Sequence, residues 1–167
     1  MTKLEPPDSH FVSAAIGWLG LGNAAEARAE LARISAENQN LPDILEVRWE
    51  ICVRETDWEE AVVVARRLLL EAPDRASGFL HLAYALRRTA DGSVRKAWNT
   101  LLPAFDKFPK FPLISFNLSC YACQLNQLEA ARVWLKRAFV IGGKGKMKPM
   151  ALADTDLQPL WHEIKEM

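Results

Sequence analysis

The stretch LEVRWEICVRETDWEEAVVVARRLLLEAP, residues 45–73, reads as two helices joined by a short turn. Apolar residues recur at helical spacing in both halves: Leu45, Trp49, Cys52 and Val53 in the first, and Trp58, Ala61, Val62, Ala65, Leu68 and Leu69 in the second. Thr56 and Asp57 mark the turn, and Pro73 ends the second helix because it cannot continue the hydrogen-bond ladder. Neither helix is long enough to be stable alone, so the pair must bury its apolar faces against neighbouring elements.

The same pattern recurs along the chain. An alanine, followed by apolar residues four and seven positions later, begins the motif at Ala27, Ala61, Ala97 and Ala131, a period of about 34–36 residues. A first helix precedes each motif, and turn residues separate the two helices. The sequence therefore predicts helix pairs over about residues 9–41, 42–75, 76–110 and 111–141. Pro103 lies inside the second helix of the third pair and predicts a kink near Ala104.

These segments resemble tetratricopeptide repeats (TPRs), which are helix–turn–helix units of this length. The residues that carry the resemblance are Trp18, Gly22, Ala27 and Leu31 in the first pair, Trp58, Ala61, Leu68 and Pro73 in the second, Leu82, Ala83, Ala97, Ala104 and Pro109 in the third, and Leu118, Leu128, Ala131, Leu135 and Ala138 in the fourth. The resemblance implies an all-α fold, a right-handed superhelical α-solenoid of antiparallel helix pairs with a concave groove.

The end of the chain resembles the terminal segment of many bacterial TPR proteins. Residues 142–153 are rich in glycine and lysine, and we expect a loop there. Residues 154–167 read as a capping helix whose apolar stripe, formed by Leu157, Leu160, Trp161 and Ile164, would cover the exposed end of the last repeat. Residues 1–8 are expected to form an N-terminal tail, and the whole chain to form one domain.

The amino-acid composition indicates which classes of binding partner to expect and in which cellular compartment the protein acts. Among 167 residues, 21 Lys and Arg balance 21 Asp and Glu, which argues against general binding to nucleic acid or to an anionic membrane. The three cysteines are an odd number without a disulfide-rich pattern, which favours a reducing compartment. The N-terminal sequence is a poor signal peptide, and the apolar stretch after it is too short to span a bilayer. We therefore expect a cytoplasmic protein.

A search for catalytic chemistry is mostly negative. The sequence contains no P-loop, G-x-G-x-x-G, H-E-x-x-H or G-x-S-x-G motif, so we expect no enzyme, no cofactor and no metal. His10, His81 and His162 lie in three different segments and are interpreted as surface or interface residues. Cys120 and Cys123 form a C-x-x-C pair inside a predicted helix. The simpler interpretation of this pair is that two small side chains share one face of the helix. A thiol redox protein is the alternative.

The first helix of each pair should line the groove, because stacked helix pairs curve in one direction. The residues that we expect to face a bound peptide are Glu46, Glu50, Arg54, Leu80, Tyr84, Arg87, Arg88, Phe116, Cys120 and Gln124. Tyr84 beside Arg87 and Arg88 is the strongest anchor in this set, because Tyr and Arg dominate interface energetics. The two arginines either hold a partner's carboxylate or form a solvated helix end, and the sequence leaves both readings open.

The predicted function is a non-catalytic scaffold or adaptor that binds another protein or a peptide in the groove. Two alternatives use the same fold. One is a chaperone of the secretion type. The other is a self-assembling module, because no cap precedes the first repeat and its Phe11, Ile16 and Trp18 could contact a second copy. The pattern is compatible with a monomer and with a homodimer.

Overall fold

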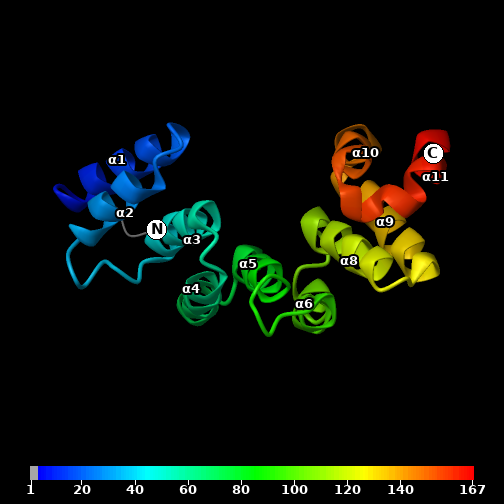
Figure 1. Cartoon of the computed structure of the whole chain (residues 1–167), viewed down its shortest axis with the longest axis horizontal. Helices are drawn as coiled ribbons and strands as arrows, with labels where there is room; N and C mark the ends of the chain where they lie inside the picture. The colour runs from blue at the N-terminus through cyan, green and yellow to red at the C-terminus, as the bar shows by residue number, and fades with distance from the viewer. Residues whose placement is uncertain (1–3) are drawn as a thin grey trace. The chain divides into compact units, whose positions relative to one another are not determined.

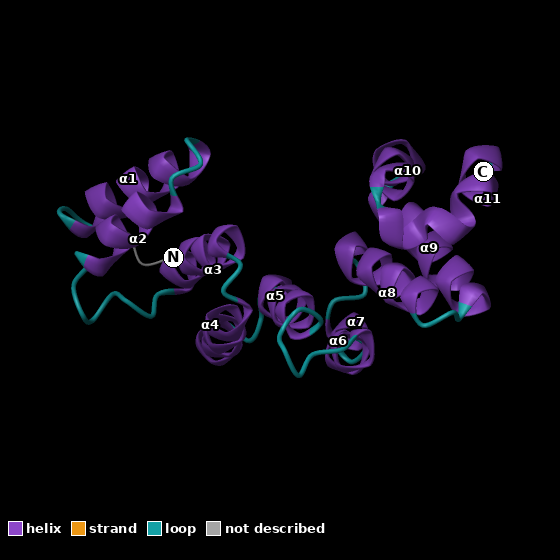
Figure 2. Cartoon of the chain, in the orientation of Figure 1, coloured by secondary structure: helices purple, strands orange, loops and turns teal. Residues whose placement is uncertain are grey.

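The computed structural model describes residues 4–167, and these residues form helices and connecting loops without a strand (Figure 2). Most of the predicted N-terminal tail is described, but residues 1–3 lie outside the described residues. Contacts divide the chain into two compact units, residues 1–85 and residues 86–167, which we describe separately. The all-α fold class predicted from the sequence is confirmed.

The described residues of the first unit form five helices in chain order (Figure 1). They are α1 (Asp8–Gly20), α2 (Ala24–Ala32), α3 (Pro42–Glu55), α4 (Trp58–Glu71) and α5 (Ala76–Leu86), the last of which ends at the unit boundary. The helix α1 packs against α2, α3 packs against α4, and α3 also contacts both α1 and α2. The alanines of the repeat pattern in this unit, Ala27 and Ala61, are fully buried where the helices meet.

Local sequence fixes the turns inside the two pairs. Asn23 and Asp57 each cap the following helix by accepting a hydrogen bond from a backbone N–H three residues later. Gly22 and Thr56, the residues just before these caps, have φ angles of 78° and 57°. In each pair, a residue with a positive φ angle is followed directly by the N-cap of the next helix, so the chain reverses its direction over two residues. The two helices therefore lie close enough to share a core.

Two apolar clusters hold the first unit together. The first, between α1, α2 and α3, contains Leu19, Leu31, Ile44 and Ile51. The second joins α3 and α4 through Leu45, Cys52, Ala61, Val64 and Leu68, and it includes Ala85 of α5. At Gly78 a Cβ atom would lie 2.9 Å from Leu69 Cδ2, which shows how closely α5 crosses α4. Burial of these faces supplies the stability that no single helix has.

Asp8 belongs to α1 although the sequence placed it in the tail. Its carboxylate is buried and accepts hydrogen bonds from the backbone N–H and hydroxyl of Ser35 and from Asn38 Nδ2, at 2.7–3.2 Å. These bonds attach the loop after α2 to the start of α1. They also give hydrogen-bond partners to polar groups of this loop, which has no regular secondary structure to supply them.

The second unit contains α6 (Val94–Leu101), α7 (Ala104–Lys107), α8 (Pro112–Gln124), α9 (Leu128–Gly142), α10 (Lys144–Ala153), the 3₁₀ helix η1 (Thr155–Leu160) and α11 (Trp161–Glu166). The predicted kink is a complete break: α6 ends at Leu101, and α7 begins after Pro103. The helix α8 packs against α6, α9 and η1, and the fully buried Ala97 and Ala131 lie on α6 and α9.

The prediction of a loop over residues 142–153 was wrong, because residues 144–153 form the helix α10. Glycines and lysines suggested a linker, but Met147 and Ala151, four residues apart, are fully buried on one side of this helix. Gly142 permits the approach, since a Cβ there would lie 2.8 Å from Met147 Sδ and from Pro112 Cβ. The closing segment buries Leu157, Leu160 and Ile164, which belong to the predicted stripe, but it divides into η1 and α11.

Candidate functional site

A hollow of about 570 Å³ opens on one face of the first unit. Its walls come from α1, α3 and α5, the first helices of the successive pairs, and its lining residues are Ile16, Glu46, Val47, Trp49, Glu50, Val53, Arg54, His81 and Tyr84. No residue of α2 or α4, the second helices, lines it. The hollow is therefore formed by the first helices of the pairs.

The pattern of α3 explains why its side chains reach the hollow. Glu46, Glu50 and Val53 recur every three or four residues and so share one face of the helix. Leu45 and Cys52 lie on the other side and are buried in the core with α4. One face of α3 is thus buried in the core, and the other face is available to line the hollow.

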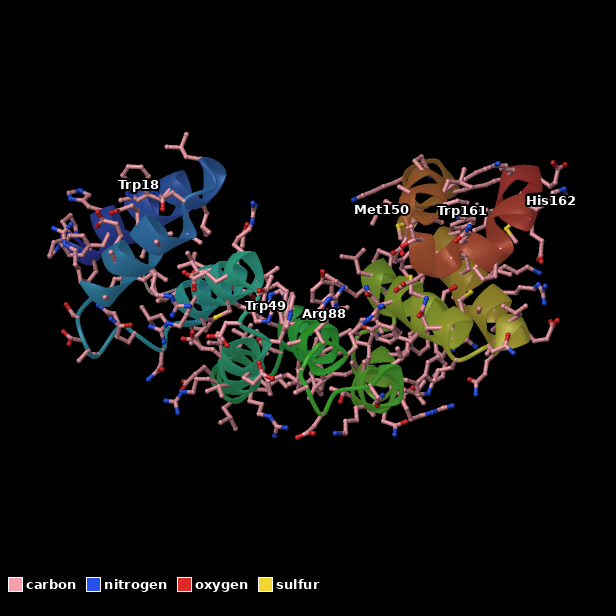
Figure 3. All side chains as sticks on the ribbon, in the orientation of Figure 1. Trp18, Trp49, Arg88, Met150, Trp161 and His162 are labelled. Carbon is pink, nitrogen blue, oxygen red and sulfur yellow. The ribbon has the colours of Figure 1, made fainter. Side chains whose placement is uncertain are left out.

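Aromatic rings form a continuous surface across α3 and α5. The imidazole of His81 stacks on Trp49, with ring centroids 3.8 Å apart and an angle of 11° between planes. Tyr84, one turn further along α5, meets Trp49 edge-on at 5.8 Å and contacts Trp58 of α4 at 6.0 Å. Figure 3 shows Trp49 projecting from α3. Because His81 stacks on Trp49 and Tyr84 contacts it edge-on, these rings have little freedom left to lose when a ligand binds.

Glu46 holds the imidazole in place. One carboxylate oxygen accepts from the Ser77 hydroxyl at 2.5 Å, and the other lies 2.5 Å from His81 Nε2. Burial acts to raise the pKa of Glu46, but the hydrogen bonds from His81 and Ser77 outweigh it and the pKa lies below its ordinary value. Because an ionised carboxylate only accepts, Nε2 of His81 carries the proton in this contact.

Glu50 and Arg54 form a looser pair at the rim. Their closest atoms, Oε1 and Nη2, are 3.3 Å apart, and about half of each side chain is exposed. A solvated pair four residues apart on one helix contributes only about 0.3–0.5 kcal/mol. Both groups are therefore free to exchange this contact for one with a ligand.

Comparison with solved structures places this arrangement among repeat proteins. The structure is similar to TTC0263, a thermophilic TPR protein in Thermus thermophilus, with 17% sequence identity, a TM-score of 0.73, and coverage of 94% of this chain and 82% of that one. The chain has the TPR fold. A second similar structure is MamA MSR-1 C2, with 14% identity, a TM-score of 0.63 and 97% coverage of both chains. No protein-family model and no curated protein matches the sequence. No helix within residues 4–167 is long and apolar enough to cross a membrane.

The structure brings together Glu46, Glu50, Arg54 and Tyr84, four of the residues expected in the TPR groove, around the hollow. Leu80 is half-buried and does not belong to the lining. Sequence reasoning did not assign Trp49 and His81 to the groove, because Trp49 was counted with the apolar residues of its helix and His81 was interpreted as a surface or interface residue. The spacing could have indicated that Trp49 lines the groove, because it lies three residues after Glu46 and so shares a helix face with it.

The remaining predicted groove residues belong to the second unit, where Arg87 already has a partner. Its guanidinium donates to both oxygens of Asp156, at 2.6 and 3.3 Å, and lies 5.5 Å from the Tyr121 ring centroid. The side chains of Arg87 and Asp156 are only 17% and 19% exposed. The carboxylate that this arginine holds is therefore one of the chain's own. Arg88 is half-buried, and Gln124 is exposed.

The expectation that Phe116 and Cys120 face a ligand is corrected by their burial, since they are 5% and 2% exposed. The prediction left one side of α8 open, as in an internal repeat. In the structure η1 packs on α8. The thiol of Cys120 donates to Asp154 Oδ2 at 3.5 Å, within the same closing segment.

Burial also determines the chemistry of the thiols. It raises the pKa of Cys123 to about 11 and that of Cys120 well above its ordinary value. Because the thiolate is the reactive form, this environment disfavours redox exchange. Ligand atoms of Cys120, Asp154 and Asp156 lie within 4.8 Å of one another, yet each already has a partner within the chain.

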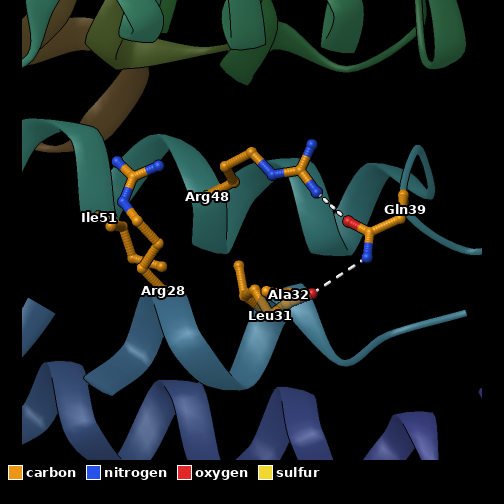
Figure 4. A pocket seen from close by; sticks show the side chains of 6 residues that line it. All are labelled: Arg28, Leu31, Ala32, Gln39, Arg48 and Ile51. Atoms are coloured by element: carbon orange, nitrogen blue, oxygen red, sulfur yellow. Dashed lines mark hydrogen bonds between the residues drawn. The ribbon is translucent and has the colours of Figure 1, made fainter. Parts of the chain in front are cut away.

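A smaller slot, of about 160 Å³, lies between α2 and α3 (Figure 4). Gln39 spans its edge, because it donates to the carbonyls of Leu31 and Ile34 and accepts from Arg48. Arg28, on the opposite side, pairs with Glu55 and Glu60. The polar groups of this slot are used to join consecutive helices, so its role is structural.

Proposed function

We propose that this chain is a non-catalytic binding module that takes a segment of another protein in the hollow of its first unit. The TPR fold supports a protein-interaction scaffold in general. The observation that favours this hollow is its lining: first helices of successive repeats contribute locked aromatic rings together with the rim charges of Glu50 and Arg54. Free, buried cysteines accord with a reducing compartment, and we propose that the module acts in the cytoplasm.

Site-specific photocrosslinking tests this proposal. The photoreactive amino acid benzoylphenylalanine replaces Tyr84, an aromatic residue of the hollow, and in a matched protein it replaces Val63, an exposed residue of α4 outside the hollow. Each protein is irradiated in a lysate of the source organism, and crosslinked products are identified by mass spectrometry. We expect a protein partner that crosslinks at position 84 and not at position 63. The same products at both positions would contradict the proposal.

Self-assembly is a second candidate, because α1 and Leu21, the residue that follows it, expose apolar surface. Ile16 and Leu21 are 53% and 78% exposed, and Ile16 also lines the hollow. Sedimentation velocity at two concentrations, with Leu21→Ser as the variant, tests it. A concentration-dependent dimer that the variant abolishes would favour this candidate, and its crosslinks at position 84 would join two copies of this chain.

A further inference from the structure

The charges around the hollow are unequal. The carboxylates of Glu46 and Glu50 and the guanidinium of Arg54 line it. Two carboxylates therefore face one guanidinium, which gives these three groups an excess of negative charge. Glu46 is committed internally, because Ser77 and His81 occupy both of its oxygens. Glu50 is the carboxylate available to a ligand, since its bond with Arg54 is long and solvated.

The aromatic surface next to Glu50 favours the same sign of ligand charge. Trp49 is the adjacent residue on α3, and Tyr84 meets it edge-on from α5. A Lys ammonium or Arg guanidinium is attracted to the face of Trp or Tyr, most strongly when it is removed from water. A ligand carboxylate would be repelled by the faces of these rings and by Glu46 and Glu50, so that Arg54 is the lining group that would attract it.

Apolar side chains border the charged centre. Ile16 on α1 is exposed, and Val47 and Val53 on α3 are half-buried in the wall. Aliphatic groups at these positions are suited to apolar residues on either side of a bound cation. The hollow thus has a negative, aromatic centre with aliphatic edges.

We propose that the hollow selects a partner segment in which a lysine or arginine is flanked by apolar residues. This inference rests on the proposed function of the same site. The basic side chain lies against Trp49 and Tyr84 and pairs with Glu50, which gives up its contact with Arg54. Glu46 and His81 act as positioning residues that keep the Trp49 ring in place.

Three synthetic peptide pools test the selectivity directly. The pools share randomised apolar residues and differ only at a fixed central position, which is lysine, glutamate or norleucine. Binding to the full chain is measured by fluorescence anisotropy, and the site is verified from the indole N–H resonance of Trp49, assigned with Trp49→Phe. We expect the lysine pool to bind at least about tenfold more tightly than either other pool, with an affinity that falls as salt rises.

Charge variants separate this selectivity from general stickiness. Glu50→Gln should weaken binding of the lysine pool by about tenfold, whereas Glu37→Gln, which removes an exposed carboxylate outside the hollow, should leave it unchanged. Arg54→Gln should strengthen the same binding, because it removes the internal competitor for Glu50. Circular dichroism shows whether each variant keeps its helical content.

Three possible results would each contradict a different part of this proposal. If the glutamate or norleucine pool binds best and still shifts the Trp49 resonance, the hollow binds peptides but the inferred basic residue is wrong. If Arg54→Gln weakens binding of the lysine pool, the roles assigned to Glu50 and Arg54 are wrong. If no pool shifts the Trp49 resonance and photocrosslinking at position 84 captures nothing, both the inference and the proposed function fail.

Discussion

The imidazole of His81 lies parallel to the indole of Trp49, with ring centroids 3.8 Å apart, and thereby joins α5 to α3. Glu46 fixes this stack, because its carboxylate accepts from His81 on the same side of the first unit. The contact turns two residues that sequence reasoning left aside into the floor of the hollow. A floor that is already ordered costs little conformational entropy when a ligand binds.

The ionised state of Glu46 should stabilise the first unit in a pH-dependent way. The pKa of Glu46 lies below its ordinary value in the folded chain, so its contribution is fully present above the ordinary pKa and is lost as the pH falls through the folded one. Glu46→Gln should therefore cost about 1.5–3 kcal/mol at pH 7, the range for hydrogen bonds to a charged group, and much less near pH 3. Urea unfolding at both pH values, with Glu37→Gln as the control, measures the difference. An equal cost at both pH values would contradict the assignment.

Two glycines of the second unit should respond in opposite directions to alanine. At Gly142 a Cβ would lie 2.8 Å from Met147 and from the Pro112 ring, so Gly142→Ala should destabilise the unit by about 1–3 kcal/mol. At Gly145, inside α10, a Cβ meets nothing within 4 Å, and Gly145→Ala should stabilise the helix by up to about 1 kcal/mol. Thermal unfolding of both variants measures the effects. Similar shifts in both would mean that α10 is not docked through Met147.

The pair formed by Arg87 and Asp156 should couple the start of the second unit to its closing segment. Arg87→Met leaves a largely buried carboxylate without its partner and should cost about 1.5–3 kcal/mol. The double variant with Asp156→Asn should recover part of that loss, because it removes the unpaired charge. Urea unfolding of the complete cycle gives the coupling energy, with Lys110→Gln, an exposed cation of the same unit, as the control. A coupling energy of zero would show that the pair is not formed in solution.

The thiols should be unreactive in the folded chain. Burial raises the pKa of Cys52 to about 12 and that of Cys123 to about 11, so thiolate is scarce at pH 8. We expect slow reaction of Cys52, Cys120 and Cys123 with a disulfide reagent, the same count of thiols with and without reductant, and rapid reaction of all three in urea. Fast loss of two thiols on treatment with oxidised glutathione would restore the redox alternative.

The helix pairs could be predicted because their signals are local. The buried alanines, the caps at Asn23 and Asp57 and the break at Pro103 depend on residues that are close together in the sequence. The helix α10 was missed for the opposite reason. Its glycines and lysines indicate a loop, and only the packing of Met147 under Gly142 shows why the segment is helical.

The same distinction applies to the candidate site. Glu46, Glu50, Arg54 and Tyr84 follow from the rule that first helices line the groove, and the structure arranges them around one hollow. The stacking of His81 on Trp49 joins residues 32 positions apart and leaves no local mark. The capping segment was expected to cover the end of the last repeat, but the sequence did not show that this segment places Asp154 against Cys120 of α8.

Because Asp156 belongs to the same chain as Arg87, its carboxylate acts as a tethered ligand. The fold of the second unit holds this carboxylate 2.6 Å from the guanidinium although the two residues are 69 positions apart in the sequence, so the pair forms without the translational cost that a separate ligand would incur. An acidic peptide at a micromolar concentration therefore competes poorly for this arginine. The occupation of Arg87 is thus a property of the folded chain itself, independent of any contact that a partner makes elsewhere.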